Sequence, residues 1–405
     1  MVYDIRDISF ANEGQRKIDW VSKWMKVVNT LHDKYKEDGV FKGKRIAICI
    51  HLEAKTAYLA LTLQRLGAEV WITSSNPLST KDDVCAALAK HGVNVFAKHG
   101  ASKEEYSNYI ESIVNAKPHT VVDDGGDICE YFHKNPKYAT NLQGICEETT
   151  SGVNRLKELE KNGKLKYPSI GINDAQSKYL FDNRYGTGQS TWTAITHLTN
   201  MSVAGKVVVV VGYGWVGRGI AVRAQGMGAE VIVTEIDPWK GLEARMDGYK
   251  VMTIDEASRL GDIFITATGE KMVIRKEHMK NMKDGAFLAN AGHFDYEIDV
   301  NGLKNITKTV NHVRNEIDEY KKESDSVQTF LEDENYRDVL EDVVYLVPHI
   351  SENLDAQDQL HPAPDHLNIF FDSIQEYPQK NNVILQQPNR KPYAPSAQVP
   401  CRATI

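Results

Sequence analysis

The 405 residues are enough for two domains that each bury a sizeable core, and 41% hydrophobic with 25% charged residues is ordinary for a soluble protein. The net charge of −7 argues against a nucleic-acid partner, and no apolar run is long enough to span a bilayer. We see no signal peptide, and the five cysteines are odd in number without a CxxC pair. We therefore expect a cytoplasmic protein with reduced thiols and no metal site.

The first part of the chain is predicted to alternate helices and strands. Residues 12–37 have helical periodicity, with the apolar stripe Ile18, Val21, Met25, Val28 and Leu31. Alternating elements with short links then indicate a parallel sheet covered by helices on both faces. The expected strands are 45–50, 69–73, 93–97 and 120–122, and the expected helices are 54–66, 81–91 and 103–116.

Polar residues follow three of these strands, at the edge where such sheets bind ligands. His51 follows the first strand, Asn76 follows the second, and Asp124 lies in the DDGGD sequence after the fourth. Taken alone, His51 would be a structural histidine and DDGGD a turn. Because these groups come from distant positions to one edge, we interpret them together as a candidate site.

Residues 144–200 connect the two halves. The sequence EETTSG at 147–152 is compatible with a simple helix start, where an acid lies near the helix dipole. Lys178, Asp182 and Asn183 lie close together, and their spacing alone favours a solvated, charged turn. A helix is expected to follow over residues 190–201.

The stretch 206–237 is the most informative part of the sequence. An apolar strand at 207–211 leads into GYGWVG, an amphipathic helix and a second strand at 230–234. This is one βαβ unit with the dinucleotide fingerprint. The alternative is a glycine turn in an α/β domain without a ligand.

Each residue of the fingerprint has a physical reason. Gly212 makes the tight turn, Gly214 lets the backbone approach a pyrophosphate, and Gly217, after Val216, lets helix and strand pack closely. The helix N-terminus supplies N–H groups for the phosphates. Glu235 ends the second strand, where an acid binds ribose hydroxyls and favours NAD over NADP. We therefore predict NAD as the cofactor.

The rest of the second half supplies further strands. Thr268 follows one of them and is placed to face a nicotinamide, while Gly292 and His293 follow another. The fold class is therefore α/β, with two doubly wound parallel-sheet domains of the Rossmann type. The additional strands are 250–253, 263–266, 286–290 and 343–347, and the predicted domains are a substrate-binding domain at 1–185, an NAD-binding domain at 186–347 and an atypical tail at 348–405.

Several motifs together resemble the S-adenosylhomocysteine hydrolase family, over roughly residues 1–300. The similarity is closest to the shorter form found in archaea and thermophilic bacteria, which has HLEAKT and a threonine, here Thr187, after NRYG. The motifs are HLEAKTAYLALTLQRLGAEV, SSNPLST, VVDDGGD, CEETTSGVNRL, INDAQSKYLFDNRYGTGQS, VVVVGYGWVGRGIA, TEIDP and ANAGHFDYEID.

The resemblance implies a hydrolysis that uses a redox cofactor. In the family, tightly held NAD oxidises the ribose 3′-hydroxyl to a ketone, which acidifies the hydrogen on C4′. Loss of that proton expels homocysteine from C5′, water adds, and the alcohol is restored. The substrate is a small molecule, and the family forms homo-oligomers, tetramers or dimers.

The resemblance also assigns roles on the ribose side. Lys178 matches the lysine beside the 3′-hydroxyl, and a base there requires neighbours and burial to lower its pKa. Glu148 and Asp182 match carboxylates that hold the ribose hydroxyls, and Asn183 matches the adjacent amide.

On the 5′ side, Asp124 matches a carboxylate near C4′ and C5′. His51 matches the acid and base at the leaving sulfur and the attacking water, and His293 matches the histidine that faces the 5′ carbon. Thr149 and Thr150 match threonines that contact the cofactor.

Two features depart from the family pattern. Glu53 and Lys55 replace a threonine and a glutamate near the base of the substrate, and they either select the base or pair with one another. The family's C-terminal segments, which close the neighbouring subunit's NAD site, are not recognisable after Val347. The last 57 residues contain seven prolines and seven glutamines, without a helical stripe.

Two other functions stay open. A 2-hydroxyacid dehydrogenase shares the two-domain plan, but we cannot place its arginine and acid–histidine pair. A cofactor-binding protein without activity is compatible with the unusual tail.

Overall fold

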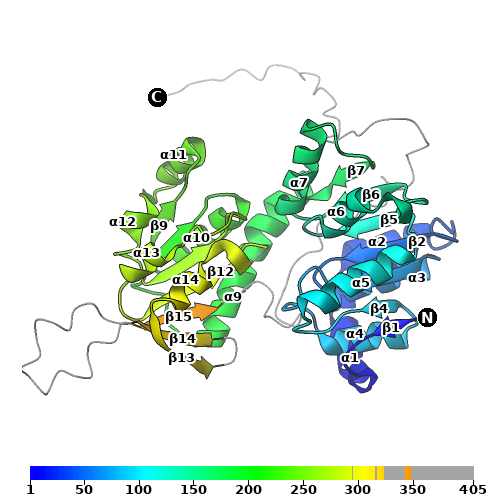
Figure 1. Cartoon of the computed structure of the whole chain (residues 1–405), viewed down its shortest axis with the longest axis horizontal. Helices are drawn as coiled ribbons and strands as arrows, with labels where there is room; N and C mark the ends of the chain where they lie inside the picture. Colours follow the sequence, from blue (N-terminus) through cyan, green and yellow to red (C-terminus); the bar gives the residue numbers. More distant parts are fainter. Residues whose placement is uncertain (294, 315–316, 323–342, 348–405) are drawn as a thin grey trace, which may run out of the picture.

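The computed structural model describes residues 1–293, 295–314, 317–322 and 343–347. Figure 1 shows two α/β units side by side, each built on its own sheet, with helix α9 (Gly188–Thr199) between them. This agrees with the predicted fold class. The predicted tail at 348–405 lies outside the described residues.

The first sheet has seven strands in the order β1-β4-β3-β2-β5-β6-β7, and all of its neighbouring pairs are parallel. The order reverses between β2 and β5, which creates the crevice where such sheets bind ligands. The predicted strands are present, whereas β1, β6 and β7 are short strands that the sequence analysis did not identify. The strands are β1 Tyr3–Asp4, β2 Arg45–Cys49, β3 Glu69–Thr73, β4 Asn94–Phe96, β5 Thr120–Asp123, β6 Gly144–Glu147 and β7 Ser169–Gly171.

Helices cover both faces of this sheet because its strands alternate their side chains between two cores. Ile46 and Ile48 pack with helices α1 to α4, and Ala47 and Cys49 pack with α5 to α7. The helices are α1 Ala11–Ser22, α2 Lys26–Tyr35, α3 Ala54–Arg65, α4 Asp82–Lys90, α5 Lys103–Asn115, α6 Asp127–Lys134 and α7 Thr150–Lys161.

The helix predicted over 12–37 is broken into α1 and α2. The predicted apolar stripe is nevertheless buried throughout, from Ile18 to Leu31. Met25 leaves helical geometry at ψ 63°, and the Asn29 side chain donates to the Ser22 carbonyl at 2.8 Å. A side chain therefore satisfies a carbonyl near the break, which periodicity alone does not reveal.

The second sheet has the order β10-β9-β8-β11-β12-β15-β14-β13. Its first six strands are parallel and reproduce the dinucleotide-binding order, with the reversal between β8 and β11. The antiparallel pair β13 and β14 was not predicted, and it extends the edge beyond β15. The strands are β8 Val207–Val211, β9 Glu230–Thr234, β10 Lys250–Val251, β11 Ile263–Thr266, β12 Ala286–Asn290, β13 Thr307–Arg314, β14 Ile317–Lys322 and β15 Val343–Val347.

Two cores again lie on opposite faces of this sheet. Val208 and Val210 pack with α9 to α11, and Val209 and Val211 pack with α12 to α14. None of the described helices has the length and apolar character needed to cross a membrane. The helices are α10 Trp215–Gly226, α11 Pro238–Met246, α12 Ile254–Ala257, α13 Lys276–Lys280 and α14 Val300–Lys304.

The connection between the two halves contains a π-helix, η4 (Tyr179–Thr187), directly after the short helix α8 (Gln176–Lys178). It packs closely on α10, since a Cβ at Gly219 would lie 1.8 Å from the Arg184 carbonyl oxygen. Wide helical turns of this kind are frequent at functional sites. The segment that carries Lys178 is therefore held against the helix of the dinucleotide fingerprint.

Candidate active site

A cavity of about 1210 Å³ is lined by strand ends of both sheets. It exceeds the roughly 300–1,000 Å³ typical of a single small-molecule site. All predicted site residues line it except Gly217, which packs beneath the glycine loop, and Asn76, whose side-chain oxygen instead accepts from the Leu78 N–H at 2.9 Å in the turn after β3. These lining residues are His51, Glu53, Lys55, Asp124, Glu148, Thr149, Thr150, Lys178, Asp182, Asn183, Gly212, Gly214, Val216, Glu235, Thr268, Gly292 and His293.

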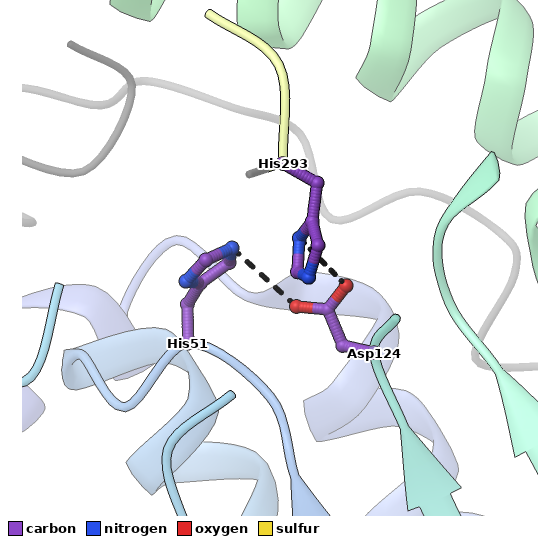
Figure 2. Close-up of side chains that lie close together, drawn as sticks. All are labelled: His51, Asp124 and His293. Carbon is purple, nitrogen blue, oxygen red and sulfur yellow. Dashed lines mark ion pairs between the residues drawn. The ribbon is translucent and has the colours of Figure 1, made fainter. Parts of the chain in front are cut away.

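Three of them form a cluster that joins the two sheets (Figure 2). His51 follows β2, Asp124 follows β5 and His293 follows β12. The Asp124 carboxylate lies 3.4 Å from His51 Nε2 through one oxygen and 3.4 Å from His293 Nδ1 through the other. One buried carboxylate therefore holds two imidazoles at the same point of the cavity.

The charges within this cluster support one another. Burial would raise the pKa of Asp124, but His293 and His51 outweigh it and lower the pKa below its usual value. One ring nitrogen of His51, one of His293 and one carboxylate oxygen of Asp124 also lie within 4.8 Å of one another, a spacing that can accommodate a metal ion. The arrangement equally suits proton transfer, for which a carboxylate beside two imidazoles is well equipped.

Lys178 is the centre of a second cluster and is only 2% exposed. Its ammonium lies 2.7 Å from Glu148 Oε1 and 3.2 Å from Asp182 Oδ2. It also donates to the side-chain oxygens of Asn183 at 2.7 Å and Asn173 at 3.2 Å. The predicted residues therefore form a compact network, and the solvated-turn interpretation is wrong.

The expected fall in the pKa of Lys178 is also wrong for this structure. Burial would lower its pKa, but the adjacent carboxylates of Glu148 and Asp182 raise it above its usual value. Burial, together with the charges of Asp124 and Asp182, raises the pKa of Glu148 to about 7, although Lys178 opposes this rise. Glu148 therefore titrates near neutral pH.

Sequence reasoning missed three polar residues that orient these clusters. Asn173 accepts from Lys178 and from the Asn183 amide at 2.8 Å, and it donates to the Thr150 hydroxyl at 3.1 Å. Ser79 Oγ lies 2.7 Å from His51 Nδ1, and Ser75 donates to Asp124 at 2.9 Å. Their only signal was position, in the INDAQSK and SSNPLST motifs.

Glu53 and Lys55 lie at the start of α3, which borders the cavity. Glu53 is the N-cap residue, and its Oε1 accepts from the backbone N–H groups of Lys55 at 2.8 Å and Thr56 at 3.0 Å. One carboxylate oxygen therefore satisfies the helix N-terminus. Both side chains remain part of the cavity wall.

The glycine loop is shaped for a dinucleotide. Gly212 has φ +99°, and a Cβ on Gly217 would lie 2.0 Å from the Gly212 carbonyl oxygen. A Cβ added at Gly214 would have no other described atom within 4 Å, so space is open above the N-terminus of α10. No side chain among the described residues caps this helix N-terminus. Open backbone at an uncapped helix N-terminus fits a pyrophosphate.

The remaining predicted cofactor residues surround this loop. Glu235 accepts from the Tyr213 N–H at 2.7 Å, so its carboxylate also braces the loop. Thr268 follows β11, and Gly292 follows β12. Thr149 and Thr150 begin α7 on the opposite wall of the cavity.

Comparisons with known proteins agree with this geometry. Residues 2–140 match the family model described as S-adenosyl-L-homocysteine hydrolase, and residues 183–334 match its NAD binding domain. An S-inosyl-L-homocysteine hydrolase of Methanocaldococcus jannaschii is 52% identical over 320 residues, 79% of this chain and 77% of the relative.

Two further relatives carry the name adenosylhomocysteinase. The protein of Thermococcus kodakarensis is 54% identical over 79% of this chain and 76% of its own length. The protein of Aquifex aeolicus is 48% identical over 79% of this chain and 77% of its own length. The chain belongs to the S-adenosyl-L-homocysteine hydrolase family.

Proposed function

We propose that this chain hydrolyses the thioether of S-adenosyl-L-homocysteine or S-inosyl-L-homocysteine to the nucleoside and L-homocysteine, using bound NAD. The observation that carries the proposal is the meeting of three groups in one cavity: the Lys178 network, the Asp124–histidine cluster and the glycine loop. Relatives with either substrate name are about equally similar to this chain.

The residues that would hold NAD are those whose geometry fits it. Gly214 and the N–H groups at the start of α10 would hold the pyrophosphate, Glu235 would bind ribose hydroxyls, and Thr268 with Gly292 would border the nicotinamide. Thr149 and Thr150 approach from the first sheet. Bound NAD would supply reversible hydride transfer at the 3′ carbon of the substrate ribose.

Lys178 removes the proton of the 3′-hydroxyl. Glu148 and Asp182 accept hydrogen bonds from the ribose hydroxyls, and Asn183 orients them. A hydroxyl that enters between the ammonium and its carboxylates replaces ion pairs with weaker contacts, which lowers the pKa of Lys178 toward that of a base. Glu148, with its pKa of about 7, is the acceptor for the displaced proton.

Asp124, His51 and His293 act on the 5′ side. Asp124, held as a carboxylate, removes the proton from C4′ once the neighbouring 3′ carbon is a ketone. The C5′–S bond then breaks, and His51 delivers a proton to the homocysteine sulfur. His51 subsequently takes a proton from the water whose oxygen forms the new C5′–O bond, while Asp124 returns its proton to C4′, and His293 helps to exclude other water.

Lys55 favours the inosyl substrate. An ammonium can only donate hydrogen bonds, and hypoxanthine offers an acceptor at O6 where adenine carries an amino group. Glu53 caps the N-terminus of α3 through one carboxylate oxygen, and both Glu53 and Lys55 line the cavity.

The wider organisation follows the same reasoning. Residues 1–185 would bind the substrate and 186–347 the NAD, with the tail at 348–405 outside both. We also propose a cytoplasmic homo-oligomer, a tetramer or dimer, on the basis of the family resemblance and the odd number of cysteines.

Release of homocysteine, measured with a thiol reagent, tests the proposal directly. Each substrate should yield one thiol per nucleoside, and no NADH should accumulate in solution because the hydride is returned in each turnover. Steady accumulation of free NADH would indicate a dehydrogenase instead. NAD binding without thiol release would indicate a binding protein without activity.

A further inference from the structure

Two buried glutamates occupy equivalent places behind the cavity, one in each half of the protein. Glu147 ends β6, and Glu297 lies in a 3-10 helix after β12, Asp295–Glu297. Both are 0% exposed, and neither lines the cavity. They therefore do not contact the substrate or the cofactor directly.

Glu147 links two strand-end loops of the first sheet. Its Oε1 accepts the N–H groups of Gly125 and Thr149, each at 3.0 Å. Gly125 directly follows Asp124, and Thr149 begins the approach to α7. Gly152 makes room for the carboxyl group, because a Cβ there would lie 2.1 Å from the carboxyl carbon.

The second oxygen of Glu147 has a different environment. Oε2 is buried and has no hydrogen-bond partner among the described residues. Burial, with the charges of Asp123 and Asp124, raises the pKa of Glu147 well above its usual value, which favours the protonated carboxyl. An amide could therefore replace this group while keeping both observed hydrogen bonds at Oε1.

Glu297 performs the corresponding task in the second sheet, but it uses both oxygens. Oε2 accepts the Thr268 N–H at 2.9 Å and the Thr268 hydroxyl at 2.7 Å, and Oε1 accepts the Gly269 N–H at 2.8 Å. A Cβ at Gly292 would lie 1.7 Å from Oε1. This carboxylate thus links the loops after β11 and β12.

We propose that Glu147 and Glu297 are positioning residues that fix the loops carrying the reacting groups. Glu147 holds the backbone beside Asp124 and Thr149, and Glu297 holds Thr268 and packs against Gly292, the neighbour of His293. The separate tasks assigned to Glu147 and Glu297 rest on the proposed function. Their hydrogen bonds are observed independently of it.

The isosteric pair Glu147→Gln and Glu297→Gln tests the difference between the two carboxyl groups. E147Q should retain turnover within about twofold, because only one oxygen accepts hydrogen bonds and an amide oxygen replaces it. E297Q should bind NAD about tenfold more weakly or worse, because an amide nitrogen must face an N–H or hydroxyl donor. Equal NAD affinities in E297Q and the wild type, or equal losses in both variants, would overturn the proposal.

Glu147→Met then tests positioning against general destabilisation. At saturating NAD, E147M should still form bound NADH on mixing with substrate, while homocysteine release falls about tenfold or more because Asp124 is misplaced. Homocysteine release by E147M at the wild-type rate would refute the role of Glu147. Equal losses of bound NADH and of homocysteine release in a folded protein would refute it as well. If E147M does not fold, the comparison of E147Q with E297Q still tests the proposal. A wild-type protein that releases no homocysteine would refute the proposed function instead.

Discussion

Alanine substitutions in the glycine loop should separate close packing from cofactor contact. A Cβ at Gly217 would lie 2.0 Å from the Gly212 carbonyl oxygen, whereas ordinary contacts begin near 3.4 Å. Helix α10 must therefore move away from the loop by more than about 1 Å, and overpacking of this kind costs about 1–3 kcal/mol. We expect Gly217→Ala to lower Tm by about 2–12 °C and to weaken NAD binding.

Gly214→Ala should behave differently. The position has nothing within 4 Å, and its φ of −71° is accessible to alanine. The apo protein should therefore keep its Tm or gain about 0.4–1 kcal/mol from reduced freedom of the unfolded chain. The new methyl group occupies space where the pyrophosphate would approach, so NAD affinity should fall at least about tenfold.

Gly226→Ala is the matched control, because it lies in the same helix, away from the cavity, with nothing within 4 Å. Thermal unfolding with and without NAD, together with calorimetric titration of NAD into apo protein, measures both effects. G214A should lose the NAD-dependent rise in Tm that G226A retains. Equal NAD affinity in G214A and G226A, or an unchanged Tm in G217A, would refute this account of the loop.

Three further predictions follow from the cavity and the tail. Lys55→Glu should shift the kcat/KM ratio of adenosyl to inosyl substrate about 10- to 100-fold toward adenosyl, as a mismatched buried polar group costs about 1–3 kcal/mol; an unchanged ratio contradicts the role of Lys55. The kcat/KM should fall as pH drops through about 7, where Glu148 becomes protonated, and a constant value across this range contradicts its role. Deleting residues 350–405 should change NAD retention and assembly little, since few apolar residues accompany seven prolines there; gel filtration that shows loss of both would establish a function for the tail.

The sequence was sufficient to predict the main strands because buried parallel strands are nearly continuous apolar runs. Val207–Val211 is such a run, and the glycines after it identified the turn. The short strands β6 and β7 carry little pattern of their own; β6 forms by pairing with β5, and β7 by pairing with β6. The hairpin of β13 and β14 has mostly polar residues, and its place at the sheet edge depends on tertiary pairing.

The candidate site was predictable to the extent that its residues follow strands. His51, Asp124 and Thr268 could be placed on sheet edges from their positions alone. The residues that hold these side chains in place, such as Glu147 and Glu297, could not be predicted. In the sequence, a carboxylate that accepts backbone N–H groups looks like any other acid. EETTSG contains both kinds: Glu147 is turned inward to the loops, while its neighbour Glu148 contacts Lys178 in the cavity.

The protonation of Lys178 shows why contacts, rather than burial alone, decide the chemistry of this site. Burial would lower the pKa of this lysine, yet the adjacent carboxylates of Glu148 and Asp182 raise it and favour the ammonium. The same carboxylates are the groups proposed to bind the ribose hydroxyls, so substrate binding competes directly for the contacts that hold the proton. A lysine that becomes basic only when its carboxylates are occupied by the ribose hydroxyls would couple removal of the 3′-hydroxyl proton to a filled site.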